Sequence, residues 1–253
     1  MPLVIKYGGN AMTSLELRRK VAAEIRALAE ESAAPVVVHG GGPFIKAALD
    51  GAGLEHSFIR GLRVTTGESL PIVERVLTLL NKEIAQEMGN AVGLTARDAG
   101  VVKAERFDEA LGYVGRVTGI NTRLLSSLVS AKFTPVIACL GENETGDGVL
   151  NVNADEIAGA AAGALGAPVV FLTDIAGVLD NPEDRTSLLR ELSSNEIHAR
   201  IADGRISGGM IPKVEAALGA LEQGASYAVI ADGRVPEQLR EAIAGNAGTK
   251  IIA

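Results

Sequence analysis

The sequence predicts an α/β fold with a largely parallel sheet. Short apolar runs alternate with longer segments of helical periodicity, the order that places helices between successive parallel strands. The 30 glycines cluster at the ends of the apolar runs, where the chain turns toward its next element. The length of 253 residues fits one large domain or two closely joined lobes.

The first elements follow this alternation closely. A strand is expected over residues 3–7, an apolar run that ends in two glycines. Ser14 is a suitable N-cap for a helix that continues to about residue 32, because apolar residues recur there at helical spacing. A second buried strand is expected over 35–39, and the three glycines after it open a helix to about residue 49.

The middle of the chain is less regular. Residues 56–65 resemble a short strand pair, and 68–88 form a long helical pattern that tolerates Pro71 in its first turn. The segment 91–98 fits neither pattern and is left open.

The rest of the chain returns to clear patterns. Residues 101–107 and 113–119 alternate as the strands of a hairpin do. The elements expected after them are a helix over 124–131, a strand over 135–140, a polar hairpin over 142–153, a helix of Ala and Gly over 155–165, a strand over 169–172, helices over 195–202 and 210–223, a strand over 227–231, a helix over 237–244 and a strand over 250–252. A soft boundary near 166–168 divides the chain into lobes 1–166 and 167–253, which we expect to share one sheet.

Charge and composition exclude several classes of function. A net charge of −7, a pI near 5.1 and the absence of Trp disfavour binding to a phosphate backbone or to stacked bases. The single cysteine, Cys139, excludes a disulfide framework and a thiolate metal cluster, and it is expected as a buried, inert thiol. The histidines at 39, 56 and 198 lack the spacing of metal ligands.

No segment is suited to a membrane. The longest uncharged stretch, 157–173, is broken by Gly166-Ala167-Pro168 and is too short to span a bilayer. The first residues lack the apolar region of a signal peptide. We therefore expect a soluble, cytoplasmic protein.

Three glycine-rich turns indicate a polyanionic ligand such as a nucleoside triphosphate. They are Gly8-Gly9, Gly40-Gly41-Gly42 and Ser207-Gly208-Gly209, and each leads toward a helix start, where backbone N–H groups bind anions. A purely structural turn remains the alternative for each of them. The chain has no Gly-Lys pair for a Walker A loop, and Ile45 replaces the third glycine of the dinucleotide fingerprint. The second departure disfavours a nicotinamide dehydrogenase.

Two lysines stand where local rules disfavour a cation. Lys6 lies inside an apolar strand, where an unpaired charge is costly, although a lysine at a strand end can also extend into solvent. Lys213 lies near the start of an expected helix, where a cation opposes the helix dipole. Because such violations often mark function, both lysines are candidates for contact with a transferring phosphoryl group.

Polar residues on two further segments are candidates for binding an acceptor. Asn151 and Asn153 share one face if their segment is extended, and Asp155 then lies at the start of the next helix. The alternative is that Asn153 only caps that helix. Arg63 is a candidate clamp for a substrate carboxylate, with a solvated surface arginine as the alternative.

Six motifs, in this order, resemble the amino acid kinase superfamily from end to end. They are IKYGGNAM at 5–12, HGGG at 39–42, GLRVT at 61–65, NVNAD at 151–155, TDIAGV at 173–178 and GGMIPK at 208–213. The GLRVT and NVNAD motifs are most similar to the members that phosphorylate the γ-carboxylate of N-acetyl-L-glutamate for arginine biosynthesis. The fold implied is a three-layer αβα sandwich with a mainly parallel sheet of about eight strands.

The resemblance also implies roles for individual residues. Lys6 and Lys213 would stabilise the transferring phosphoryl group, and Asp155 would hold both ammonium groups. The implied acetylglutamate-binding residues are Gly41, Gly42, Asn151, Asn153 and Arg63, the last through the α-carboxylate. The implied nucleotide-binding residues are Gly8, Gly9, Thr173, Asp174, Ile175, Ala176, Gly177, Val178, Arg205, Ile206 and Ser207, with Gly41 also donating to the phosphates.

Partners and alternatives follow from the same resemblance. ATP would arrive with Mg²⁺ held by phosphates and water, because no carboxylate cluster is evident. A homodimer through residues 1–166 is implied, and nothing in the sequence indicates a nitrogen-regulatory partner. Arginine-inhibited members carry a helix before the first strand, so we expect no arginine inhibition here. The alternatives are a kinase for carrier-bound aminoadipate and a non-catalytic nucleotide-binding relative.

Overall fold

A computed structural model describes residues 2–31, 33–181, 183–184, 186–235 and 237–253, and its centre is one eight-stranded sheet. The strands are β1 (Pro2–Tyr7), β2 (Ala34–His39), β5 (Ala91–Leu94), β8 (Thr134–Ala138), β11 (Val169–Thr173), β12 (Glu191–Ser193), β13 (Ala228–Asp232) and β14 (Thr249–Ile252). Their order is β12-β14-β13-β11-β1-β2-β8-β5, and all neighbours are parallel except β13 and β14. The predicted mainly parallel sheet is confirmed.

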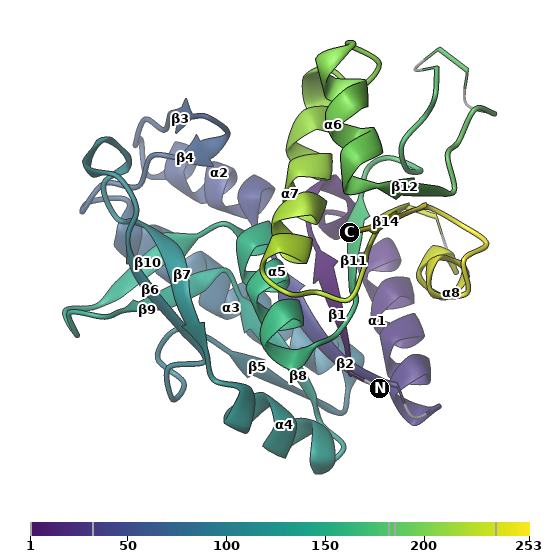
Figure 1. Cartoon of the computed structure of the whole chain (residues 1–253). Coiled ribbons are helices and arrows are strands. Elements are labelled where there is room, and N and C mark those ends of the chain that lie inside the picture. The colour runs from purple at the N-terminus through teal and green to yellow at the C-terminus, as the bar shows by residue number, and fades with distance from the viewer. Residues whose placement is uncertain (1, 32, 182, 185, 236) are drawn as a thin grey trace.

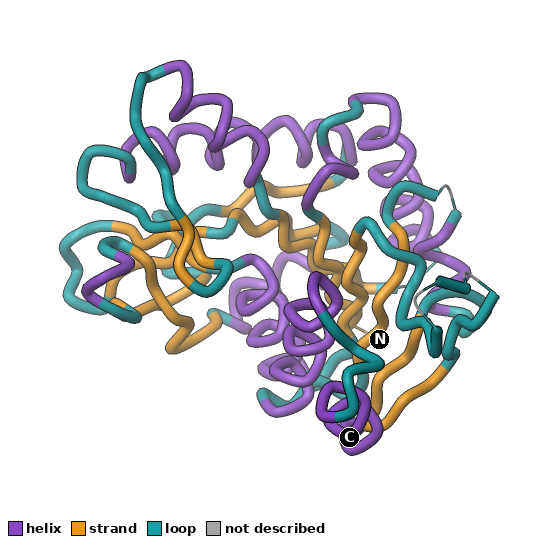
Figure 2. Tube along the Cα trace, turned by 90° about the horizontal axis from the view of Figure 1, so that it is seen from above, coloured by secondary structure: helices purple, strands orange, loops and turns teal. Residues whose placement is uncertain are grey.

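Helices cover both faces of this sheet, so the predicted three-layer sandwich is also confirmed. One face packs against α1 (Leu15–Glu30), α3 (Leu70–Met88) and α8 (Gln238–Ile243). The other packs against α4 (Thr122–Ser130), α5 (Ala154–Leu165) and α7 (Ile211–Glu222). Figure 2 shows the strands as a layer between these helices. The remaining helices are α2 (Gly42–Gly51) and α6 (Ser194–Ala202).

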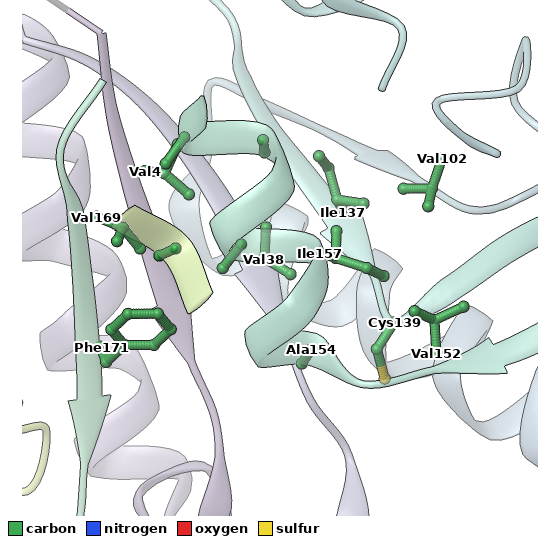
Figure 3. Packing of buried hydrophobic residues seen from close by; sticks show 14 of the residues in the cluster. Val4, Val38, Val102, Ile137, Cys139, Val152, Ala154, Ile157, Val169 and Phe171 are labelled. Atoms are coloured by element: carbon green, nitrogen blue, oxygen red, sulfur yellow. The ribbon is translucent and has the colours of Figure 1, made fainter. Parts of the chain in front are cut away.

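The alternation of side chains along β1 explains why the sheet is buried on both faces. Leu3, Ile5 and Tyr7 belong to the apolar cluster on the α1 side, whereas Val4 belongs to the cluster on the α5 side. Figure 3 shows Val4 next to Val169 on the neighbouring strand, beside the helix that carries Ile157. Lys6 takes the α5 side by the same alternation, which directs the one cation of this strand toward that helix.

The small residues of α5 allow it to approach both the sheet and α7 closely. Ala158, Ala161 and Ala162 are completely buried. A Cβ on Gly163 would lie 1.9 Å from the carbonyl oxygen of Gln223, so only glycine fits at this crossing. The helix is capped by Asn153, whose side chain accepts from the N–H of Asp155 at 3.1 Å.

A second group of strands extends from one end of the sheet (Figure 1). Four strands close into a small barrel: β6 (Val102–Arg106), β7 (Val114–Ile120), β9 (Leu140–Asn143) and β10 (Val149–Val152). The hairpins predicted over 101–107 with 113–119 and over 142–153 are confirmed as antiparallel pairs. The short hairpin β3 (Phe58–Ile59) and β4 (Leu62–Arg63) confirms the strand pair expected over 56–65.

The structure differs from the sequence predictions at a few positions. The segment left open at 91–98 begins with β5, an edge strand whose pairing with β8 supplies what its own pattern lacks. The strand predicted over 135–140 ends at Ala138, because Leu140 already begins the barrel strand β9. The three-residue strand β12 was not predicted, since so short a segment shows no periodicity.

The sheet continues without interruption through the soft boundary at 166–168. Strand β11, which follows the boundary, pairs with β1 along Val4–Tyr7. The carboxyl ends of these two strands therefore bring residues from both lobes to one edge of the sheet. None of the described helices is long and apolar enough to cross a bilayer.

Candidate active site

Lys6 reaches from β1 to the start of α5, as its side of the sheet requires. Its Nζ lies 2.9 Å from Oδ1 of Asp155, and the side chains are 15% and 30% exposed. Asp155 lies in the first turn of α5, at the end of the helix where the dipole attracts negative charge. This ion pair places a partly desolvated ammonium group at the edge of the sheet, beside the turn that begins at Gly8.

Gly8 leaves the space that the Lys6 head group occupies. A Cβ at this position would lie 3.0 Å from Nζ and 3.1 Å from Cε of Lys6. We expect Gly8→Ala to move the ammonium group and to lower kcat about tenfold or more while the chain stays folded, because small misplacements of a reacting group are costly. The control is Gly219→Ala in α7, where an added Cβ meets nothing within 4 Å. Equal kcat values for the two variants and the wild type would contradict this account.

Lys213 enters the same region from α7. Gly208–Met210 form a short 3-10 helix before α7, which places Lys213 in the first turn of that helix. Its Nζ lies 2.5 Å from Oδ1 of Asp174, the residue directly after β11. The hydrogen bond from Lys213 holds the pKa of the Asp174 carboxyl below its ordinary value, so this carboxylate is charged at neutral pH.

The expected role of Asp155 needs a correction on this point. Asp155 was expected to hold both ammonium groups, but in this structure it pairs with Lys6, and Asp174 pairs with Lys213. The reason is topological, since Asp174 follows β11 on the side where α7 begins. Two separate ion pairs thus replace the single expected bridge.

The two ion pairs line one cavity of about 320 Å³. Lys6 and Asp155 come from the first lobe, Lys213 and Asp174 from the second, and Gly9 lies at its rim. Opposite charges balance in this cavity as it stands. A polyanionic ligand would attract both ammonium groups and compete with the carboxylates for them. The structure therefore brings together the lysines that the sequence singled out.

A second cavity of about 240 Å³ adjoins the first and shares Lys6 and Gly9 with it. We call it the acceptor cavity, because it is lined by the predicted acceptor-binding residues Gly41, Gly42, Arg63, Asn151 and Asn153. Gly41 is packed tightly, since a Cβ there would lie 2.6 Å from Cδ2 of Leu77. Because the two cavities share part of their wall, ligands bound in both would be neighbours beside Lys6.

Arg63 brings a partly unsatisfied cation to the second cavity. Its Nη2 donates to the carbonyl oxygen of Gly42 at 3.3 Å, and its guanidinium lies 4.7 Å from the centre of the Phe58 ring. Its Nη1 is buried and has no hydrogen-bond partner in the part of the chain that the structure describes. Burial lowers the pKa of Arg63 from its ordinary value, although an arginine stays charged at any physiological pH. A buried donor of this kind fits an incoming carboxylate.

Asn151 is held by Thr65 on the neighbouring segment. Its Nδ2 donates to Oγ1 of Thr65 at 3.0 Å, and that hydroxyl donates to the carbonyl oxygen of Arg63 at 3.2 Å. Thr65 is completely buried, so the two segments that face the acceptor cavity are fixed to each other. Asn153 lines the same cavity and also caps α5. Its role as a helix cap therefore does not exclude a role in binding the acceptor.

The remaining residues expected to bind nucleotide have varied surroundings. Thr173 lines the first cavity, and its Oγ1 accepts from the N–H of Ile175 at 3.2 Å. The N–H of Val178 donates to Oγ1 of Thr249 at 2.8 Å, and a Cβ on Gly177 would lie 2.6 Å from the same oxygen. These contacts give Gly177 and Val178 a structural role whether or not nucleotide binds nearby.

The segment before α7 shows a similar division. Arg205 pairs with Asp203 and lies within 3.8 Å of Asp180, whereas Ile206 is buried in the core. Ser207 is exposed just before the 3-10 helix. Contacts of Ala176, Arg205, Ile206 and Ser207 with a nucleotide stay predictions.

Sequence reasoning missed several residues of the site. Phe58 stacks on Arg63, and Pro43 lies in both cavities, but neither residue type stands out in a single sequence. Cys139 lines the acceptor cavity, and burial raises the pKa of its thiol to about 12, in keeping with an inert thiol. The ion pair of Lys213 with Asp174 was not foreseen, because it joins positions 39 residues apart.

Known proteins show the family of this chain. A model of the amino acid kinase family matches residues 1–232. The chain is 51% identical over 251 residues to an acetylglutamate kinase of Deinococcus radiodurans, covering 99% of this chain and 100% of that protein. It is 44% identical over 253 residues to an acetylglutamate kinase of Stutzerimonas stutzeri, covering 92% and 83% respectively.

A solved structure supports the fold. A Giardia carbamate kinase superposes with a TM-score of 0.74 at 19% identity, covering 99% of this chain and 98% of that chain. This likeness concerns the fold alone. From the family model and the full-length relatives, the chain belongs to the amino acid kinase family and, within it, to the acetylglutamate kinases.

Proposed function

We propose that this protein transfers the γ-phosphoryl group of ATP to the γ-carboxylate of N-acetyl-L-glutamate, a step of arginine biosynthesis. The identity to acetylglutamate kinases over full length supports this activity. The observation that carries the proposal is the pair of adjoining cavities that share Lys6 and Gly9. One cavity is lined by Arg63, a cation suited to a carboxylate, and the other gathers two lysines for phosphates.

The acceptor would lie in the smaller cavity with its α-carboxylate on Arg63. Arg63 lines this cavity, and among the described residues its Nη1 has no hydrogen-bond partner, so the guanidinium would have a donor for a carboxylate. Asn151 and Asn153 would contact the other polar groups of acetylglutamate. The γ-carboxylate would then extend toward Lys6, where the two cavities meet.

The reaction itself asks little proton chemistry of the protein. A γ-carboxylate is already an anion at pH 7, since its ordinary pKa is about 4.3, so no general base is required. The obstacle is repulsion between this anion and the phosphates. Lys6 and Lys213, with the backbone N–H groups of Gly9 and Gly41, would stabilise the charge on the phosphoryl group in transit. Asp155 and Asp174 would hold the ammonium groups in the cavity until the substrates bind.

Mg²⁺ fits this site as a companion of ATP. No group of three or more His, Cys, Asp and Glu side chains gathers among the described residues, and the two carboxylates of the first cavity are engaged by lysines. The phosphates and water would therefore hold the ion. Bound there, Mg²⁺ would neutralise part of the phosphate charge.

The two lobes would divide the binding of substrates between them. Residues 1–166 supply Arg63 and Asn151 and would bind acetylglutamate, whereas 167–253 supply Asp174 and Lys213 and would bind ATP. We place a homodimer interface on the first lobe. Strand β5 stands at one end of the sheet, and Leu79 on the adjacent α3 is 62% exposed, which suits a partner surface.

Arg63→Ala is expected to raise the KM for acetylglutamate about 10- to 100-fold, because a hydrogen-bonded charge pair is lost. The change in kcat should be smaller. The KM for ATP should stay near the wild-type value, because Arg63 does not line the first cavity, in which the two lysines would bind the phosphates. Steady-state kinetics with each substrate varied in turn measures both constants. The control is Arg116→Ala, which removes an exposed ion pair with Glu105. An unchanged KM for acetylglutamate in the Arg63 variant would refute this placement.

The proposed activity is tested by ATP turnover against a panel of acceptors. The panel contains N-acetylglutamate, glutamate, aspartate, N-acetylaminoadipate and UMP. We expect the highest kcat/KM with N-acetylglutamate and formation of an acyl phosphate, which hydroxylamine traps as a hydroxamate. Preference for N-acetylaminoadipate would favour the sister kinase, and no turnover of any acceptor would favour a non-catalytic relative.

A further inference from the structure

A buried hydrogen-bond relay connects the Gly40–Gly42 turn with α3. His39, the last residue of β2, and Asn81 of α3 are both completely inaccessible to solvent. Nδ1 of His39 lies 2.8 Å from the carbonyl oxygen of Gly40, and its Nε2 lies 3.1 Å from Nδ2 of Asn81. Neither residue lines the two cavities described above, so neither is placed to contact a ligand there directly.

The partners of Asn81 determine which nitrogen of His39 carries the proton. Nδ2 of Asn81 donates to the carbonyl oxygen of Val136 at 2.8 Å, and a carbonyl can only accept. The amide is thereby oriented with Nδ2 toward His39, so Nε2 of His39 must be the acceptor. Nδ1 then carries the proton and donates it to the carbonyl oxygen of Gly40. Every donor and acceptor in this chain of contacts is consistent with one tautomer.

The bond to Gly40 fixes the direction of the next N–H group. In a planar trans peptide, the carbonyl of one residue and the N–H of the following residue point in opposite directions. Holding the Gly40 carbonyl against His39 therefore directs the N–H of Gly41 away from His39. Gly40, Gly41 and Gly42 all line the acceptor cavity. The N–H of Gly40, which belongs to the preceding peptide, donates to the carbonyl oxygen of Tyr7 at 3.0 Å, so the backbone of Gly40 is held on both sides of its Cα.

We propose that His39 and Asn81 are positioning residues, which hold the Gly40–Gly41 peptide so that the Gly41 N–H faces the reacting groups. Neither residue touches substrate in this arrangement; both act through the peptide. The inference rests on the proposed function, in which Gly41 donates to the phosphoryl group and the acceptor. It adds two residues, one of them on a helix that carries no other part of the site.

The energetics of the relay agree with a functional purpose. Oδ1 of Asn81 is buried and finds no hydrogen-bond partner among the described residues, a costly state for a polar atom. An apolar residue at this position would avoid that cost but would also release Nε2 of His39. Burial lowers the pKa of His39 to about 4, so the ring is neutral at working pH and its single proton stays on the nitrogen that faces Gly40.

The first test measures the tautomer in the wild-type protein without substrate. Long-range ¹H–¹⁵N spectra of histidine-labelled protein distinguish a protonated from an unprotonated ring nitrogen, and His39→Asn assigns the signal. We expect Nδ1 to be protonated and Nε2 to be unprotonated at pH 7. A proton on Nε2, or on both nitrogens, would overturn the proposal. This measurement is independent of the acceptor that the enzyme uses.

The second test compares variants that keep or remove the donor to Gly40. His39→Asn places an amide donor near the position of Nδ1, whereas His39→Leu fills the space without a donor. We expect His39→Leu to lower kcat/KM for acetylglutamate about 10- to 100-fold, and His39→Asn to retain most of the activity. Nucleotide affinity, measured by direct titration with ADP, should change little in both variants. Equal losses in the two variants would show that only packing matters and would refute the positioning role.

A double-mutant cycle and a core control complete the design. Asn81→Leu should lower kcat/KM in the same direction, and combining it with His39→Leu should add little, because both changes release the same peptide. Val36→Ala, in the same strand but three residues before His39, should reduce stability and leave kcat/KM unchanged. Additive losses in the cycle, or a similar loss in the Val36 variant, would contradict the proposal. Turnover by the wild type on the same acceptor separates failure of this inference from failure of the proposed function.

Discussion

Replacing Lys6 by alanine is expected to lower kcat about 10²- to 10³-fold, the usual cost of removing one donor from a developing charge. The KM for acetylglutamate should change little, because in the proposed arrangement Arg63 and Asn151 would hold the acceptor elsewhere in the cavity that they line. Asp155 would then lose its partner at 2.9 Å and add an uncompensated negative charge beside the phosphates. Steady-state and single-turnover kinetics measure the loss in the chemical step.

Two comparisons make the Lys6 result specific. Lys20→Ala removes an exposed ion pair with Glu16, and it should leave kcat unchanged. The uncompensated charge of Asp155 should also weaken nucleotide binding in Lys6→Ala. The double variant Lys6→Ala/Asp155→Asn removes both charges, so it should recover nucleotide affinity but not kcat. Wild-type turnover in Lys6→Ala would show that the ammonium group has no part in the chemistry.

Replacing Lys213 by alanine is expected to lower kcat by a similar factor and, in addition, to raise the KM for ATP. The reason is Asp174, whose charge is compensated by Lys213 at 2.5 Å and would face the nucleotide alone in the variant. Each lost charge-assisted contact costs about 1.5–3 kcal/mol, which amounts to roughly a tenfold or larger change in affinity. Titration with ADP and steady-state kinetics separate the two effects.

The paired variant Lys213→Ala/Asp174→Asn tests the electrostatic part of this account. Neutralising Asp174 should return much of the ATP affinity, while kcat stays low because no ammonium group is restored. If the double variant binds nucleotide no better than Lys213→Ala, then repulsion by Asp174 does not explain the loss.

Local rules in the sequence were sufficient to find the two lysines. Lys6 stands out as a cation in an apolar strand, and Lys213 as a cation at a helix start, so each violates a rule that can be checked without a structure. The strands and helices that carry them were also predicted, because their periodicity is strong. Arg63 and Asn151 were candidates because of their places in the GLRVT and NVNAD segments, and both line one cavity in the structure.

What the sequence could not supply is the pairing of distant residues. The bond between His39 and Asn81 joins positions 42 residues apart, and no local pattern marks Asn81 as different from other polar residues of a helix. The same holds for Lys213, which pairs with Asp174 in this structure, whereas the resemblance implied a contact with Asp155. The segment that contains strand β5 was left open for a related reason, because the stability of this strand comes from its pairing with β8.

The central claim is that an ammonium group from each lobe meets the same phosphoryl group. A crystal structure of the wild-type enzyme with acetylglutamate, MgADP and aluminium fluoride, a planar mimic of that group, tests it directly. We expect Nζ of Lys6 and Nζ of Lys213 both within hydrogen-bonding distance of the fluoride ligands, with each lysine drawn from its aspartate toward the mimic. If either lysine instead points away from the mimic in the closed complex, the two-lysine mechanism is wrong.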